Sequence, residues 1–436
     1  MTWKRTSTIL TLLITLGTVV PAAATTRAPA PSVVKALDRT AHPLRTVEPG
    51  GDTRDLRPLD RMIADAEVVG VGEATHSSHD FFALKDRLFR HLVEKKGFRT
   101  FALEAPWSTG LRLDDYVVHG KGDPRRIMRE EFQRDYLWWN NTDYLRLVEW
   151  MRAYNIRHPA DPVRFLGDDT AWTGPEVYDT VVARVAAADP ASGRRLNGLY
   201  RGLRPTVPTG TYIEGYLGKP YAERREMAER TGEALELVRR AGVDDRTVQD
   251  ATAIDRTAHQ YAFDFEEPGQ IAEAMRYRDH AMAANVLWWQ RHSGTRVLLS
   301  AHDDHVGYES YDPAYPKMQG AFLRDGLGAS YVNIGLTFDR GSFNATDQDE
   351  TAVRRWTVGP AALGSNERTL DRVRYRDYAV DLRTVGSPAR TWLRRARPTY
   401  RIGTAYPDGP HDVALARTHD ILIHLHRVTA ARLRDR

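Results

Sequence analysis

The sequence predicts an α/β protein with a three-layer core, in which a mostly parallel sheet lies between helices, and with a large helical insertion. Six short apolar segments rich in β-branched residues are predicted to form buried strands. They lie at residues 68–72, 100–103, 163–166, 296–299, 330–336 and 421–425. Helical stretches separate most of them, and this alternation is typical of a parallel sheet covered on both faces.

The helical pattern is clearest after the first strand and in the middle of the chain. Ser77 or Ser78 can cap the first helix and Gly97 can end it, and between them apolar residues recur at helical spacing. Residues of about 176–292 are rich in Ala, Arg and Glu and contain no convincing strand. We expect them to form a helical insertion between two strands, as a lid or wall over a site.

The N-terminus has the features of a secretory signal peptide. Lys4 and Arg5 precede an apolar stretch at residues 9–20, and an Ala-x-Ala cleavage site follows. The sequence therefore predicts a signal peptide at residues 1–24, cleaved after Ala24, and a secreted protein. The alternatives are an uncleaved anchor or a buried helix. We expect residues 25–45 to form a flexible tether and residues 46–436 to form one catalytic domain.

Composition limits the classes of partner. The chain has 436 residues with a formal net charge of +4, and two of those charges lie in the predicted signal peptide. The remaining charge is nearly balanced, so it gives little reason to expect a nucleic acid or, after cleavage, a membrane as partner. There is no cysteine, which excludes disulfides, thiolate metal sites and a cysteine nucleophile. We expect a monomer that binds a small molecule.

Carboxylate or imidazole groups follow four consecutive predicted strands. Because ligands bind beyond the carboxyl ends of the strands in open parallel sheets, we expect these groups to converge on one edge. The residues are Glu73 and His76, then Glu104, then Asp168 with Asp169, then His302 with His305.

His76 is the candidate general base. It precedes the first helix, and the positive end of the helix dipole disfavours a protonated ring there. Glu73 or Glu104 could orient the imidazole and stabilise the cation after it takes a proton. The alternative is that Glu73 and His76 only close a turn and cap the helix.

His302 and His305 lie three residues apart, after the fourth strand. They could hold an anionic tetrahedral intermediate or protonate a leaving alkoxide. The alternative is a metal pair, because His-x-x-His beside Asp303 and Asp304 resembles a chelating site.

The helix predicted from about 275 to 292 carries Arg278 and Asn285 on the same face as an apolar stripe. Buried polar groups need partners, so Arg278 either pairs with a carboxylate such as Asp168 or points into the site with Asn285. We expect Arg278 mainly to support the site, with Arg278, Asn285 and Asp168 near the substrate.

Several motifs are absent from the sequence, namely Gly-x-Ser-x-Gly, Gly-x-Gly-x-x-Gly, a P-loop and His-Glu-x-x-His. Histidines and carboxylates without a nucleophile motif indicate direct attack by water. We expect no cofactor and no metal, with the metal pair at His302 and His305 as the alternative.

These residues resemble the erythromycin esterase family. The similarity runs through Gly72-Glu73-Ala74-Thr75-His76, Leu103-Glu104, Arg278-Asp279, Ala301-His302-Asp303-Asp304-His305 and Asp420-Ile421-Leu422-Ile423-His424, in the family's order. The resemblance implies hydrolysis of an ester or a macrolide lactone. It implies His76 as general base supported by Glu73 and Glu104, and His302 and His305 as site residues.

Two departures from the family pattern concern the substrate. Lys85 stands where the family usually has arginine, which keeps the charge but loses the fork geometry, and we expect Lys85 to bind substrate or help stabilise the oxyanion. Asp303-Asp304 stands where the segment usually begins with asparagine, and the added negative charge would raise the pKa of His302 and His305 or favour a metal. Export is a third departure, because intracellular antibiotic resistance would not need a signal peptide.

Three other functions stay open from the sequence. A metal-dependent peptidase or amidase of related fold would lose activity with a chelator. A haem-binding protein would show a Soret band without turnover. A biosynthetic enzyme could use the same site to form or rearrange a lactone.

Overall fold

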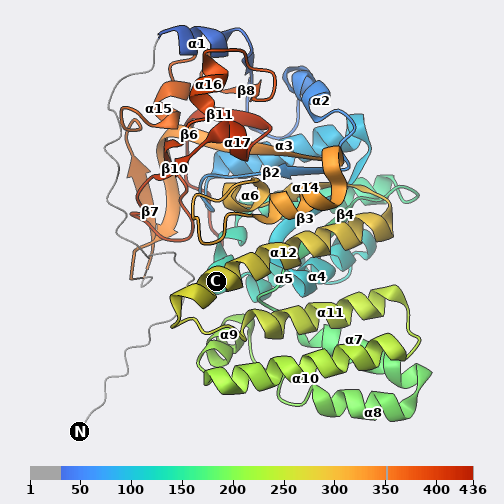
Figure 1. Ribbon diagram of the computed structural model, residues 1–436. Coiled ribbons are helices and arrows are strands. Elements are labelled where there is room, and N and C mark those ends of the chain that lie inside the picture. Colours follow the sequence, from blue (N-terminus) through green and yellow to red (C-terminus); the bar gives the residue numbers. More distant parts are fainter. Residues whose placement is uncertain (1–30, 350–351, 436) are drawn as a thin grey trace.

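The structure is a computed structural model that describes residues 31–349 and 352–435 (Figure 1). The predicted signal peptide, residues 1–24, lies outside the described residues, as does the start of the predicted tether. Within the described ranges, no helix has the length and apolar character needed to cross a membrane.

One mixed sheet forms the centre of the fold. In the described part of the chain it has nine strands, in the order β1-β8-β11-β6-β2-β5-β3-β4, and β7 pairs with the far end of β6. Its strands are β1 (His42–Pro43), β2 (Val68–Val71), β3 (Phe98–Pro106), β4 (Arg164–Asp169), β5 (Arg296–Ser300), β6 (Tyr331–Thr346), β7 (Val353–Val358), β8 (Tyr378–Asp381) and β11 (Ile421–Val428). A separate antiparallel pair is formed by β9 (Arg397–Thr399) and β10 (His411–Val413).

The six predicted strands are confirmed, and they are β2, β3, β4, β5, β6 and β11. Neighbours among them pair in parallel. They are buried along almost their whole length, which explains their continuous apolar sequences. β6 runs ten residues further than the predicted segment because from Gly341 onward it pairs with β7, while Phe343 and Ala345 stay buried in the core. Gly341 marks the change, since a Cβ there would lie 2.0 Å from the carbonyl oxygen of Val428 on β11.

Helices cover both faces of the sheet, so the predicted three-layer α/β fold is confirmed (Figure 1). The apolar face of α3 packs with α6 against one side, and α12 packs with α14 against the other. The helices of this part are α2 (Arg57–Ile63), α3 (His79–Lys96), α4 (Trp107–His119), α5 (Pro124–Glu131), α6 (Thr142–Arg157), α12 (Pro268–Ser293), α13 (Asp303–Val306), α14 (Gln319–Leu327), α15 (Asn366–Leu370), α16 (Ala389–Leu393) and α17 (Leu415–Thr418). Short 3₁₀ turns lie at Arg54–Leu56, Arg134–Trp139 and Gly328–Ser330.

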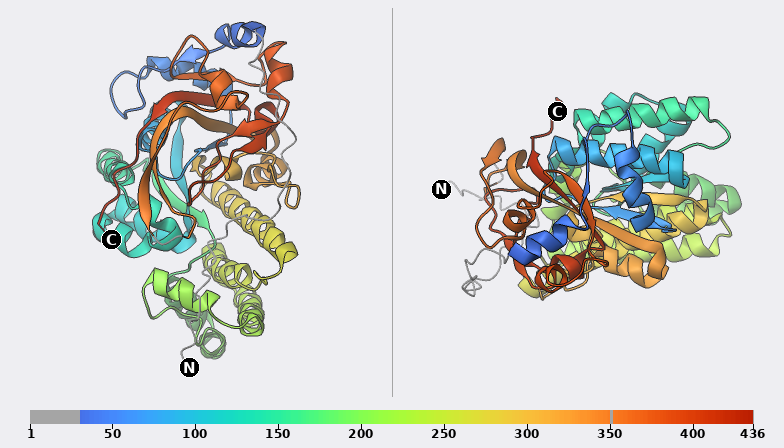
Figure 2. Two further views of the ribbon diagram at one scale, coloured as in Figure 1. Left: turned by 90° about the vertical axis from the view of Figure 1, so that its left-hand side faces the viewer. Right: turned by 90° about the horizontal axis from the view of Figure 1, so that it is seen from above.

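The helical insertion is present, and it has its own apolar core. Among the described residues no strand lies between 175 and 293. Five helices pack together beside the sheet (Figure 2), namely α7 (Pro175–Ala188), α8 (Pro190–Leu199), α9 (Thr209–Leu217), α10 (Tyr221–Arg240) and α11 (Asp245–Gln260). The boundary near 292 differs from the structure, because α12 belongs to both parts. Ala274 packs in the core of the insertion, whereas Val286 and Trp289 pack on the sheet.

Residues 31–45 differ from the predicted flexible tether. They form α1 (Pro31–Asp38) and β1, and β1 pairs antiparallel with β8. Val33, Ala36 and Leu37 are buried against the C-terminal part of the chain. These three apolar residues are spaced for one helical face, and burial of that face holds the segment in place.

Candidate functional site

A cavity of about 240 Å³ lies beyond the carboxyl ends of β2, β3, β4 and β5. Its charged lining groups come from β3, α12, α13 and the segments beside the sheet that carry Asp135, Arg401 and Asp408. The helical insertion covers the cavity with apolar side chains such as Ile213 and Leu217. Of the predicted site residues, it is lined by His76, Glu104, Arg278, His302 and His305.

His76 is held by a buried chain of charged groups. Its Nδ1 lies 3.0 Å from Oε1 of Glu73, and the other oxygen of Glu73 accepts a hydrogen bond from Nζ of Lys85 at 2.5 Å. Burial raises the pKa of Glu73, but the Lys85 ammonium and the His76 ring outweigh it and hold that pKa below its ordinary value. Glu73 is therefore an ionised acceptor that fixes the proton of His76 on Nδ1 and leaves Nε2 facing the cavity.

Lys85 does not lie where substrate binding would place it. Its side chain is fully buried on α3, between Glu73 and the carbonyl oxygen of Ala301, which accepts a hydrogen bond from Nζ at 3.2 Å. The ammonium is thus the counter-ion of Glu73, and the expectation that Lys85 contacts substrate or the oxyanion does not fit this geometry.

Glu104 contacts a different set of groups from the one we expected. Its Oε2 accepts a hydrogen bond from the backbone N–H of His302 at 2.9 Å, and its Oε1 accepts one from Arg278 at 3.0 Å. Burial raises the pKa of Glu104, but His305, His76 and Arg278 lower it well below its ordinary value. Glu104 therefore supports the other histidines directly, and it acts on His76 only through its charge.

Arg278 projects from α12 into the cavity. Its guanidinium is held by Asp169 through two hydrogen bonds, of 3.0 Å from Nε and 2.6 Å from Nη2. Burial raises the pKa of Asp169 and Arg278 lowers it, with a net decrease. The sequence predicted Asp168 as the partner of Arg278, but the partner is Asp169. These two neighbours lie on β4, where successive side chains point to opposite faces of the sheet.

His305 lies between two carboxylates. Nδ1 is 2.5 Å from Oδ1 of Asp279, and Nε2 is 3.2 Å from Oε1 of Glu104. Burial lowers the pKa of His305, but Glu104 and Asp279 raise it well above its ordinary value. We therefore treat His305 as an imidazolium that donates to both carboxylates. Its 3.1 Å contact with Nη1 of Arg278 then brings two cations together around Glu104.

His302 lies against His76 in the lining of the cavity, with 4.8 Å between the ring centroids. Its Nε2 lies 3.2 Å from the carbonyl oxygen of Ile402, and its Nδ1 accepts a hydrogen bond from the backbone N–H of Asp304 at 3.2 Å. Burial lowers the pKa of His302, whereas the Asp304 carboxylate raises it, and the net shift is upward. Both ring nitrogens already have protein partners, so His302 packs beside the base.

Asp168 and Asn285 lie behind the cavity, outside its lining. Nδ2 of Asn285 donates to the backbone oxygen of Asp168 at 2.7 Å, and Gln319 donates to the Asp168 side chain at 2.6 Å. Burial and the neighbouring Asp169 raise the pKa of Asp168 well above its ordinary value, which favours its neutral form. These two residues join α12 to β4 and α14, and they do not touch the space where a substrate would bind.

Other lining residues carry no clear signal in the sequence. Tyr136 donates a hydrogen bond to Oδ2 of Asp169 at 2.7 Å, and Trp139 lies 5.3 Å from His76 between ring centroids. Both lie on the 3₁₀ segment Arg134–Trp139, whose aromatic sequence resembles core packing. Arg401 pairs with buried Asp303 from a segment with no predicted element. Asp279, next to Arg278 on α12, is the partner of His305 Nδ1 and was not among the predicted site residues.

Elsewhere in the described residues, three side chains have the arrangement of a candidate metal-binding site. Ligand atoms of Asp339, Asp371 and His426 lie within 4.8 Å of one another. Arg340 pairs with Asp339 at 2.8 Å and with Asp371 at 3.5 Å, so both carboxylates already have a cationic protein partner. At His302 and His305 the ring nitrogens are engaged with protein groups, so a metal there would have to displace several hydrogen bonds.

The chain matches the sequence profile of a family described as erythromycin esterase over residues 93–428. The matched stretch contains Glu104, Arg278, His302 and His305, and begins after Glu73 and His76. Erythromycin esterase type II of Escherichia coli is 23% identical over 327 residues, which are 68% of this chain and 74% of that protein. YbfO of Bacillus subtilis, named as a hydrolase, is 24% identical over 165 residues, 37% of this chain and 34% of that protein.

Solved structures share the fold. A protein from Bacillus cereus superimposes with a TM-score of 0.83 and 26% identity, covering 93% of this chain and 99% of that one. A protein described as a succinoglycan biosynthesis protein gives 0.82 and 26%, covering 92% and 98%. A mutant of the erythromycin esterase EreC in its open conformation gives 0.68 and 16%, covering 91% and 100%.

Proposed function

Because the chain belongs to the erythromycin esterase family, we propose that this hydrolase cleaves a carboxylic ester or lactone by means of water activated by His76. The arrangement of His76 carries the proposal. Glu73 engages Nδ1 while Nε2 faces the cavity, and Lys85 keeps Glu73 ionised. An imidazole held in this way can accept a proton from water.

The reaction can be written with protein groups alone. Water transfers a proton to Nε2 of His76, and the resulting hydroxide attacks the ester carbonyl carbon. The oxyanion faces the positive charges of Arg278 and His305, which are already in place before the reaction. As the C–O bond breaks, the His76 imidazolium returns its proton to the leaving alkoxide.

Proton return by His76 replaces the expectation that His302 or His305 protonates the leaving group. His305 donates both of its N–H groups to carboxylates, and Nε2 of His302 is directed at a backbone carbonyl. Of these three histidines, His76 is the one whose second ring nitrogen, facing the cavity, has no hydrogen-bond partner in the described part of the chain.

The volume of the cavity favours small substrates over large ones. About 240 Å³ is below the range of about 300–1,000 Å³ that is common for drug-sized ligands. A small ester or lactone fits this state of the molecule. A fourteen-membered macrolactone would require the helical insertion to move away from α12, so small esters should be tested first.

The test is hydrolysis in ¹⁸O-water by chelator-treated protein, first with aryl and alkyl esters and then with a fourteen-membered macrolactone. We expect one ¹⁸O atom in the product acid, and we expect the rate to be unaffected by the chelator. The matched control is His79→Ala, which changes a histidine three residues away that lies outside the cavity. Activity that depends on added metal would instead support the peptidase or amidase alternative, and no cleavage of any ester would refute the proposal.

A further inference from the structure

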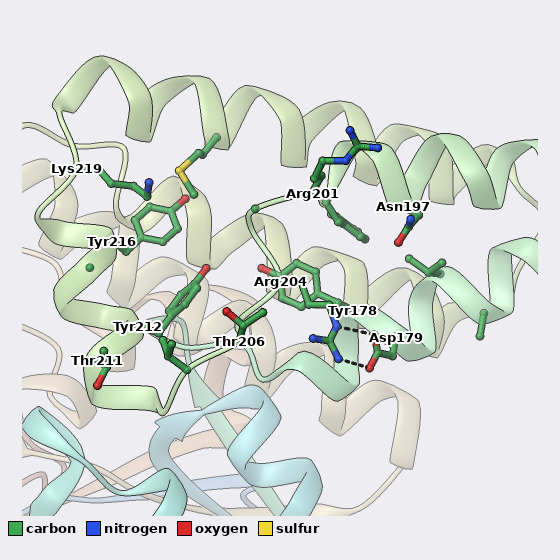
Figure 3. A pocket seen from close by; sticks show the side chains of 17 residues that line it. Tyr178, Asp179, Asn197, Arg201, Arg204, Thr206, Thr211, Tyr212, Tyr216 and Lys219 are labelled. Atoms are coloured by element: carbon green, nitrogen blue, oxygen red, sulfur yellow. Dashed lines mark hydrogen bonds and ion pairs between the residues drawn. The ribbon is translucent and has the colours of Figure 1, made fainter.

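A second cavity lies within the helical insertion (Figure 3), and we call it the outer cavity. Its volume is about 710 Å³, within the usual range for small-molecule sites. Its walls come from α7, α8, the loop at residues 200–208, α9 and the start of α10. We propose that the outer cavity binds a small molecule that has a flat apolar body and one anionic oxygen group, such as an aromatic carboxylate.

The outer cavity is separate from the active-site cavity, and α9 is the wall between them. Ile213 and Leu217, one turn apart, line the active-site cavity, whereas Tyr212 and Tyr216 line the outer cavity. Residues four apart share one face of a helix, so the two pairs mark different faces of α9. A ligand in the outer cavity therefore does not occupy the space in front of His76.

Four tyrosine side chains lie in the wall of the outer cavity. Tyr178 and Tyr200 pack edge to face with 5.0 Å between ring centroids, and Tyr212 and Tyr216 lie 5.7 Å apart on α9. Tyrosine rings offer large contact area with few rotatable bonds, which suits a flat apolar ligand. Figure 3 shows the two α9 rings on one side of the cavity, with Arg201 and Asn197 on the other.

Within residues 31–349 and 352–435, the hydroxyl of Tyr216 has no hydrogen-bond partner. Its side chain is 2% exposed, and among the described residues no group accepts or donates a hydrogen bond to this oxygen. Burial raises the pKa of Tyr216, so the hydroxyl keeps its proton and is available as a donor. Buried donors are almost always satisfied in folded proteins, so an acceptor oxygen on a ligand would complete this site.

Cationic side chains around the outer cavity favour an anion. Arg204 is neutralised by Asp179 through two hydrogen bonds of 2.7 Å, and Lys219 pairs with Glu223. Within the described ranges, the guanidinium of Arg201 has neither an ion pair nor a hydrogen bond. A carboxylate that accepts from Tyr216 would also be attracted by this uncompensated charge.

The probe is 8-anilinonaphthalene-1-sulfonate, an anionic aromatic fluorophore, titrated into the full chain and followed by its fluorescence. Tyr216→Phe, which removes one oxygen atom, should weaken binding about tenfold, and Arg201→Gln should weaken it further at low salt. Unlabelled 1-naphthoate should displace the fluorophore.

Two glycine variants test the location. Gly215 lies on α9 in the lining, and a Cβ built there meets no atom within 4 Å, so Gly215→Phe should fill the outer cavity and abolish binding. Gly198→Phe is the matched control, because Gly198 is equally open on α8 but lies outside the lining. Circular dichroism of each variant verifies folding.

A third glycine distinguishes the two cavities. Gly403 lines the active-site cavity, and a Cβ there also meets no atom within 4 Å. Gly403→Phe should therefore retain fluorophore binding while it impairs ester hydrolysis, and Gly215→Phe should do the opposite. Binding that survives Gly215→Phe, binding that is lost in Gly403→Phe, or wild-type protein that binds no fluorophore at millimolar concentration would each overturn the proposal.

Discussion

Replacement of Lys85 by methionine tests the buried chain that holds the base. The side chains of Lys85 and Glu73 are 0% and 1% exposed, and they form an ion pair of 2.5 Å. Removing one partner of such a pair leaves an uncompensated buried charge, at a cost of about 3–5 kcal/mol in the free energy of unfolding. Without the ammonium, burial dominates and the pKa of Glu73 rises.

The consequence for activity has a definite sign. Glu73 can orient His76 only when it is ionised, so a higher pKa of Glu73 moves the acid limb of the kcat/KM profile to higher pH. At a fixed pH near neutrality we expect the rate of Lys85→Met to fall about 10²-fold or more. The assays are urea unfolding and pH–rate profiles of ester hydrolysis.

Two further variants separate charge from packing. Lys85→Met combined with Glu73→Gln leaves no unpaired charge, so part of the stability should return while activity stays low. The exposed Lys95→Met should change stability by no more than about 0.5 kcal/mol. A change below about 1 kcal/mol in Lys85→Met, together with an unshifted acid limb, would refute the reasoning.

Three other predictions follow from the geometry. The hydrogen bond that His79 donates to Asp143 raises the pKa of His79 to about 9, so its stabilisation is complete below about pH 6.5 and is lost as pH rises through 9. Urea unfolding at pH 6 and 9.5 should show that His79→Gln removes this dependence, which is at most about 2 kcal/mol for a partly exposed ring. Arg278→Lys removes the planar guanidinium that donates two hydrogen bonds to Asp169, and kcat should fall about 10²-fold. A kcat within threefold of the wild-type value would contradict the role of Arg278 in stabilising the oxyanion. Asn285→Ala removes the hydrogen bond to the backbone oxygen of Asp168 and should lower the free energy of unfolding by about 1–3 kcal/mol without changing KM. A raised KM would indicate instead that Asn285 contacts the substrate.

The sheet and the active-site edge could be predicted because their physical causes act locally. Parallel strands buried on both faces give continuous apolar segments, and the group that follows each strand lies at the same edge. This placed His76, Glu104, His302 and His305 in one cavity. The short strands β1 and β8 at one side of the sheet were harder to identify because the pairing between them joins two ends of the chain.

The partners of the charged groups could not be predicted in the same way. Asp168 and Asp169 are adjacent, and only the packing of α12 decides which of them Arg278 meets. Lys85 occupies a helix position whose polar character suggests contact with solvent or substrate, yet both faces of α3 are covered. The pairing of a buried charge depends on tertiary contacts that hydrophobic periodicity does not encode.

The most direct test of the central claim is the value of kcat for His76→Gln, measured on an ester that the wild-type protein cleaves. Glutamine keeps a polar side chain in the cavity but cannot accept the proton of water. We predict a decrease of about 10²–10⁴-fold with little change in the midpoint of unfolding. A variant that retains wild-type kcat would contradict water activation by His76.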